Sequence, residues 1–238
     1  MTQQPGAGTL QVQIRHQPSF AVARLLLEPG QRVRCASGAL YMRAATLTYE
    51  AKMEGGFMGA LKRSVGGQSF FTTTWIGDPA ASSWLDLALA LPGDITTLDI
   101  DPAHGIVLTQ GSWLASTDDV QLDTKWGGFK SMLGGNRFFA VHLTGSGTAV
   151  VASYGALDHF TLEAGQSVVV DLGHVVGYDD GMGAQVQQQG GGFLNSVKSG
   201  EWLAVQLTGP GRVWTQSRSI RELSDWVREQ VPSQTSSS

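Results

Sequence analysis

A glycine pair followed by phenylalanine occurs three times in this chain, and that recurrence is the feature that most restricts its fold. Each copy continues through a short mixed segment and a second glycine to an apolar stretch, over residues 55–71, 127–139 and 191–203. The three phenylalanines of the motif are 72 and 64 residues apart. Recurrence at a nearly constant period is the sequence signature of internal repeats. The chain is therefore predicted to be a triplication.

Two further landmarks recur in the same order. The turn glycines Gly30, Gly93 and Gly165 each follow an alternating apolar stretch, and they are 63 and 72 residues apart. The pattern Val-x-Leu-Thr-Gly-x-Gly occurs at 141–147 and again at 205–211. Landmarks that keep both their order and their period support one ancestral unit copied twice.

Short alternating stretches separated by turns predict an all-β fold. The 31 glycines among 238 residues supply many such turns. We expect three tandem short double-stranded β-helix repeats, sandwich-like, in a pseudo-threefold arrangement that buries their apolar faces, with one C-terminal helix. The expected organisation is a flexible tail over 1–10, repeats over 11–82, 83–155 and 156–217, a helix over 218–231 and a polar tail over 232–238.

The C-terminal helix is predicted from two signals. Ser219 and Glu222 form the Ser-x-x-Glu capping-box pattern. Ile220, Leu223 and Val231 recur at helical spacing, with Trp226 or Val227 between them. We expect the apolar stripe to pack on the β body. The alternative is a docking helix for a partner, because interface helices use the same spacing.

Composition restricts the location and the partners. Lys and Arg number 16 against 20 Asp and Glu, a net charge of −4, so nucleic-acid binding is not expected. The single cysteine, Cys35, cannot form an intrachain disulfide and is expected to be a small strand residue. No signal peptide or apolar span is seen, which favours a cytoplasmic protein.

Chemistry-bearing motifs are sparse. The five histidines do not pair on any expected strand, and Asp99, Asp101 and His104 are the nearest cluster of metal-ligand types. Pro102 predicts a turn there, and acidic turns usually serve caps and solvent. We expect no catalytic residue, no metal and no cofactor. A metal-dependent cupin-like enzyme is kept as an alternative.

The strongest candidate surface is the Gly-Gly-Phe segments themselves. Together they hold aromatic and cationic side chains that would form one face if the segments gather at one end of the molecule. Its members are Phe57, Lys62, Arg63, Trp126, Phe129, Lys130, Phe193 and Lys198. Such a face suits a protein partner or an anionic membrane surface. The structural alternative is that the phenylalanines fill the ends of their own repeats and the glycines allow close packing.

Several ordered motifs resemble a known family. They are Leu26–Gly30 (Leu-Leu-Glu-Pro-Gly), Ser37–Met42 (Ser-Gly-Ala-Leu-Tyr-Met), the segment 55–71, Gly209–Gly211 and Gln216–Arg218. Together they look like the family of altered-inheritance-of-mitochondria protein 24 and its bacterial relatives. The resemblance implies a fold similar to the tryptophan RNA-binding attenuation protein, with three tandem copies in a pseudo-trimer. Mitochondrial members are associated with inner-membrane organisation; this chain shows no presequence, which favours a bacterial cytoplasmic member.

Because the family carries no assigned catalytic residues, the resemblance and the residues point the same way. We expect a non-enzymatic scaffold or interaction protein, with a membrane-peripheral location as one option and a homo-oligomer as another. The competing hypothesis is a small-ligand-binding protein with sites between its repeats.

Overall fold

Antiparallel β-sheet makes up most of the structure, a computed structural model that describes residues 10–53, 71–109, 111–123, 140–188 and 203–231. One α-helix, α4 (Ile220–Gln230), follows the last strand. The predicted all-β fold with one C-terminal helix is confirmed. Within the described residues, no helix is long and apolar enough to cross a membrane.

The strands form four sheets. In spatial order, the first sheet contains β1 (Gln11–Arg15), β2 (Val22–Leu27), β7 (Ser83–Ala88) and β4 (Leu40–Arg43). The second contains β5 (Thr48–Met53), β6 (Phe71–Ile76), β3 (Arg32–Ala36), β10 (Trp113–Thr117), β13 (Gly147–Tyr154) and β8 (Gly93–Ile100). The third contains β11 (Val120–Asp123), β12 (Ala140–Gly145), β9 (Ile106–Thr109), β16 (Val175–Asp179), β19 (Gly211–Gln216) and β14 (Leu157–Leu162). The fourth contains β15 (Ser167–Asp171), β18 (Leu203–Thr208) and β17 (Gly183–Gln188). A 3-10 turn, η1 (Leu172–His174), links β15 to β16.

The strand order has a period of six. Adding six to each strand number of the second sheet gives the order of the third sheet. Subtracting six from the last three strands of the second sheet, β10, β13 and β8, gives β4, β7 and β2 of the first sheet. We therefore define unit one as β2–β7, unit two as β8–β13 and unit three as β14–β19. The second and third sheets, which we call the inner sheets, each join three strands of one unit to three strands of the next. Strand β1 has no counterpart in this period.

A β-bulge also recurs with the period. The pairing register shifts after Leu40 in β4, after Trp113 in β10 and after Val175 in β16. Because a bulge adds one residue and bends its strand, the same local distortion is built into each unit.

The sheets stack, with a hydrophobic core between each successive pair. Leu85 of the first sheet and Val150 of the second contribute to the first core. Trp113 of the second and Leu143 of the third contribute to the next core. The last core lies between the third and fourth sheets and includes Val205. The two inner sheets are therefore covered on both faces, as the uninterrupted buried run in β10 shows.

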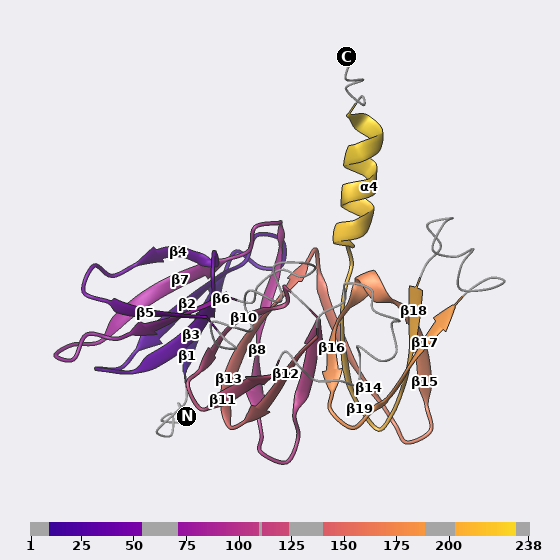
Figure 1. The fold of residues 1–238 in the computed structure, drawn as a ribbon, viewed down its shortest axis with the longest axis horizontal. Coiled ribbons are helices and arrows are strands. Elements are labelled where there is room, and N and C mark those ends of the chain that lie inside the picture. Colours follow the sequence, from indigo (N-terminus) through magenta and orange to yellow (C-terminus); the bar gives the residue numbers. More distant parts are fainter. Residues whose placement is uncertain (1–9, 54–70, 110, 124–139, 189–202, 232–238) are drawn as a thin grey trace.

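The pseudo-threefold arrangement is not confirmed. Units one and three share no sheet among the described strands, whereas units one and two, and units two and three, do. The units follow one another along the longest axis of the molecule, from the indigo end to the orange end (Figure 1). Pairwise sharing of sheets buries the apolar faces without closing a ring.

Units one and two start one strand later than the expected repeats, whereas unit three, β14–β19, coincides with the expected repeat over 156–217. Strand β7 takes in the first sheet the place that β13 and β19 take in the inner sheets, so it groups with unit one rather than beginning the next unit at residue 83. Gly30 and Gly165 form the expected turns, with φ of 70° and 82°. Gly93, expected as the third turn glycine, instead opens β8 opposite Tyr154. The acidic Asp101–His104 segment makes that turn, closed by a 3.0 Å bond from the His104 amide to the Asp101 carbonyl.

Candidate functional site

All eight residues of the expected Gly-Gly-Phe surface lie outside the described residues. The segments that carry them join β5 to β6, β11 to β12, and β17 to β18, and the two strands of each pair are antiparallel neighbours. The three segments therefore occupy equivalent places in the strand order. Whether they form one face stays a prediction.

The C-terminal helix α4 stands clear of the sheets, which corrects the expectation that it packs on the β body. The helix contains no buried residue. Ile220, Trp226, Val227 and Val231 are 53%, 59%, 42% and 60% exposed. The helix projects from the row of sheets rather than lying along them (Figure 1). The amphipathic pattern predicts that the apolar stripe is covered, but the described part of the chain's own sheets does not cover it.

Polar contacts fix the base of α4. Glu222 lies 3.6 Å from His174 of η1, and Arg221 lies 3.6 Å from Asp171 at the end of β15. The predicted capping box does not form, because Ser219 makes no side-chain cap bond and Glu222 is turned to His174 instead. These contacts hold only the first turn, so the stripe beyond it is free of the body.

The polar side of α4 carries mixed charge. Its charged residues are Arg221, Glu222, Asp225, Arg228 and Glu229. Two cations against three anions leave a net charge of −1. Helices that lie in anionic membrane surfaces are instead rich in Lys and Arg on this side. The electrostatics of α4 therefore suit a protein groove better than an anionic lipid surface.

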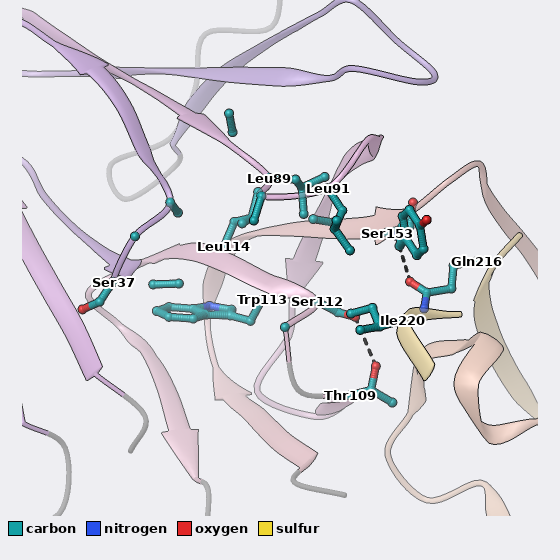
Figure 2. A pocket seen from close by; sticks show the side chains of 18 residues that line it. Ser37, Leu89, Leu91, Thr109, Ser112, Trp113, Leu114, Ser153, Gln216 and Ile220 are labelled. Carbon is teal, nitrogen blue, oxygen red and sulfur yellow. Dashed lines mark hydrogen bonds between the residues drawn. The ribbon is translucent and has the colours of Figure 1, made fainter. Parts of the chain in front are cut away.

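A cavity of about 400 Å³ opens between units one and two, close to the base of α4. Its walls are mostly apolar: Leu89 and Leu91 come from the link between β7 and β8, Trp113 and Leu114 from unit two, and Ile220 from α4 (Figure 2). The volume falls in the range of small-molecule sites.

Three polar side chains of this cavity, Thr109, Ser112 and Gln216, are bonded within the protein. Thr109 Oγ1 lies 3.1 Å from Ser112 Oγ and donates to the Val175 carbonyl at 2.8 Å. Gln216 Oε1 accepts from the Tyr154 amide at 2.9 Å (Figure 2). Its Nε2 donates to the Gly173 carbonyl, also at 2.9 Å. A polar ligand would have to compete with these bonds. The cavity therefore favours an apolar occupant.

An ion cluster lies on the outer face of the first sheet. The fully buried carboxylate of Asp86 accepts from Arg15 at 2.7 Å and from Arg24 at 2.8 and 3.0 Å. Burial by itself would raise the pKa of Asp86, but the bonds and charges of Arg24 and Arg15 outweigh it and hold that pKa below its ordinary value. Arg24 also stacks over Trp84, 4.1 Å from the ring centre. The three strands β1, β2 and β7 are thus tied together by charge.

Metal and thiol chemistry find little support. The described part of the chain contains no group of three His, Cys, Asp or Glu side chains placed to hold a metal. His142 Nε2 pairs with Asp180 at 2.8 Å, and Asp101–His104 forms the turn described above. Cys35 is buried in β3, as expected for a small strand residue, and burial raises the pKa of its thiol. A buried neutral thiol is a poor nucleophile.

The sequence did not reveal the cavity. Its lining includes small strand residues, such as Ala36, Ala88 and Ala152, which in sequence resemble any other strand alanine. The helical spacing of the apolar residues in α4, in contrast, does indicate a docking helix as an alternative.

Comparisons with known proteins cover nearly the whole chain. The family model described as Mitochondrial biogenesis AIM24 matches residues 12–218. A protein described as uncharacterized from Streptococcus pyogenes serotype M6 is 26% identical over 222 residues, which are 90% of this chain and 88% of that protein. A crystal structure of a Streptococcus pyogenes protein matches with a TM-score of 0.74 at 24% identity, and the match covers 93% of this chain and 100% of that one. At that identity the match shows the fold alone.

Proposed function

The chain belongs to the Mitochondrial biogenesis AIM24 family over residues 12–218, and we propose that it acts as a non-enzymatic scaffold that binds a protein partner through α4, the helix that follows the matched residues. The observation that carries the proposal is the exposed apolar stripe on a helix that stands clear of its own body. Helices of this kind bind by laying such a stripe into a hydrophobic groove. Trp226, the largest exposed side chain of the stripe, is the residue type most enriched among binding hot spots.

The charges on α4 support a protein groove over an anionic membrane. The stripe ends at a polar side with more acidic than basic residues. Approach to an anionic lipid surface would add repulsion, whereas a protein groove can match mixed charges at its rim.

Site-specific photo-crosslinking tests this proposal. A photoreactive amino acid replaces Trp226 on the apolar stripe or, as the matched control, Arg228 on the polar side of the same helix. After irradiation in the producing cell, we expect a discrete higher-mass adduct from position 226 and little from position 228. No adduct at position 226, or equal adducts at both positions, would contradict the proposal.

The Gly-Gly-Phe surface carries a separate membrane-binding proposal. Its test is co-sedimentation with vesicles containing anionic lipid, comparing the wild type with a Phe57→Ser, Phe129→Ser double variant. Weaker binding by the folded double variant is expected. Equal binding by both proteins, or none by the wild type, would count against this surface.

A second candidate function is the binding of an apolar small molecule between units one and two. The cavity of about 400 Å³ and its apolar walls favour it. Ala90 lines the cavity from an exposed position, so Ala90→Trp should fill the space without disturbing the core. We expect saturable binding of a fluorescent apolar dye by the wild type, weakened about tenfold or more in the variant. Absence of saturable binding by the wild type would remove this candidate.

A further inference from the structure

Units join within each inner sheet through one pair of strands. Strand β3 of unit one pairs with β10 of unit two, and β9 of unit two pairs with β16 of unit three, both antiparallel. Each join therefore uses the first short strand after the turn of one unit and the bulged strand of the next. This pairing extends the backbone ladder and closes the cores on both sides of the sheet.

The two ends of the row present the same strands without the join. By the period of six, β4 is the counterpart of β10 and β16, and β15 is the counterpart of β3 and β9. Among the described strands, β4 pairs with β7 and β15 pairs with β18, so each has one edge left over. The two edges lie at opposite ends of the molecule (Figure 1), so they do not meet within one chain.

Apolar side chains are buried in the strands that join two units and exposed in their counterparts at the two ends of the row. Around the bulge, Trp113 and Leu114 of β10 are 2% and 4% exposed, whereas Leu40 and Tyr41 of β4 are 39% and 59% exposed. In the partner strands, Val107 of β9 is 1% exposed, whereas its counterpart in β15, Val169, is 48% exposed. The end strands thus keep the apolar residues that neighbouring units cover elsewhere.

The inner joins also specify a register. The residue after the bulge lies opposite a residue of the short strand: Ala115 faces Cys35, and Gly177 faces Leu108. Met42 is the residue after the bulge in β4. In β15 the counterpart of Cys35 and Leu108 is Val170.

Three matched pairs identify that counterpart. Cys35 pairs with Thr73, Leu108 with Val141, and Val170 with Val205. Each of these partners lies four residues before the glycine that ends its strand or follows it, namely Gly77, Gly145 and Gly209. The same register at the ends would place Met42 opposite Val170 and Arg43 opposite Val169.

We propose that β4 of one copy of this chain pairs antiparallel with β15 of a second copy, with Met42 opposite Val170. The joined sheet repeats the strand order and pairing register of the two inner sheets. The ends are different surfaces, so the contact is head-to-tail and gives either rings or extended rows. The base of α4 reaches β15 only through Arg221, which lies 3.6 Å from Asp171. The apolar stripe beyond that first turn lies outside this surface, and the inference does not depend on the protein partner proposed there.

Disulfide trapping tests the register. Met42→Cys and Val170→Cys are made in separate proteins, mixed and oxidised; the buried Cys35 is left unchanged. We expect a covalent dimer from this mixture and little from either variant alone, because directly opposite residues lie within disulfide reach. The matched control mixes Met42→Cys with Tyr49→Cys, which is also accessible, at 61% exposure, but lies on β5 of the second sheet and not on β15.

A pair of charge variants tests the contact without crosslinking. Val169→Lys would place a cation opposite Arg43 of the next copy, and Val169→Glu would place an anion there. Sedimentation over a wide concentration range should show self-association of the wild type, weakened about tenfold by Val169→Lys and retained by Val169→Glu. Circular dichroism checks that both variants are folded.

Three results would overturn the proposal. They are a wild type that stays monomeric at every concentration, equal crosslinking in the Met42–Tyr49 control, and self-association that Val169→Lys leaves unchanged. A separate loss of crosslinking at Trp226 would affect only the function proposed for α4.

Discussion

The inner sheets and the end sheets are built from equivalent strands and differ in what covers them. Strands β10 and β4 share a bulge at the same place and similar apolar residues, yet Trp113–Thr117 is buried throughout and Leu40–Met42 is exposed. The neighbouring unit, rather than the strand's own sequence, decides burial here. The comparison shows how one repeated unit yields both a core strand and an edge strand.

In the first sheet, a charged cluster stands at the position where the inner sheets have an apolar residue facing a core. In the inner sheets the residue of β13 or β19 opposite the post-bulge position is apolar, Val150 or Trp214. In the first sheet the same position holds Asp86, paired with Met42 across the strands. A carboxylate bonded by Arg15 and Arg24 thus occupies a place that faces a core elsewhere. The outer face is stabilised by charge where no preceding unit covers it.

The largest difference in stability is expected between truncations of the residue before the bulge in an inner strand and in an end strand. Trp113→Ala removes a large buried side chain and is expected to lower the free energy of unfolding by about 4 kcal/mol. Leu40→Ala, its counterpart in β4, should cost about 1 kcal/mol or less, because Leu40 is already 39% exposed. Urea unfolding of dilute protein measures both. Equal losses would show that the edge of β4 is covered after all.

Removing the carboxylate of the first sheet should have the next largest effect. Asp86→Asn keeps the shape but weakens the bonds from two arginines, and a loss of about 2 kcal/mol is expected. The arginines are partly exposed, at 38% and 26% of their side chains, so water relieves part of their charge. The measurement is again urea unfolding at neutral pH, with Asp158→Asn at an exposed position of β14 as the control. A change no larger than that of the control would contradict a stabilising role for the cluster.

The same cluster predicts an acid dependence. Since the pKa of Asp86 is lower in the folded state than in the unfolded chain, its stabilisation is complete above the unfolded value, about 3.9, and is lost as the pH falls through the folded value. The stability gap between wild type and Asp86→Asn should therefore narrow on acidification from pH 7 to below pH 4. A gap that stays constant over this range would mean that Asp86 does not titrate with folding.

The smallest effect is expected at α4. Trp226→Ala should change the free energy of unfolding by less than about 0.5 kcal/mol, because the side chain is 59% exposed and the helix buries no residue. Thermal unfolding compared with Trp113→Ala provides the scale. A loss approaching that of Trp113→Ala would indicate that α4 packs on the sheets in solution.

Local patterns in the sequence predicted local structure well. Gly30 and Gly165 form the expected turns, and in both turns a glutamine side chain, from Gln31 or Gln166, accepts from the glutamate amide three residues earlier. Alternation predicted the strands, and Ile220–Gln230 is helical as its spacing indicated. These features depend on neighbours in the chain.

Features that depend on contacts between residues far apart in the chain could not be predicted from local sequence patterns. Pro92-Gly93-Asp94 has the composition of a turn, but pairing with Tyr154 and Ser153 draws Gly93 into β8. Side-chain periodicity gives the apolar side of α4 without stating what covers it. The cavity between units one and two arises from the packing of two units, so no single motif marks it.

The strands of unit two are divided between the two inner sheets, with β8, β10 and β13 in one and β9, β11 and β12 in the other. In repeat proteins the end units often fray independently, because each unit contacts only its neighbours. Here the loss of unit two would strip half of each inner sheet at once. Both inner sheets should therefore melt in a single cooperative transition, with any earlier and separate loss confined to the end sheets.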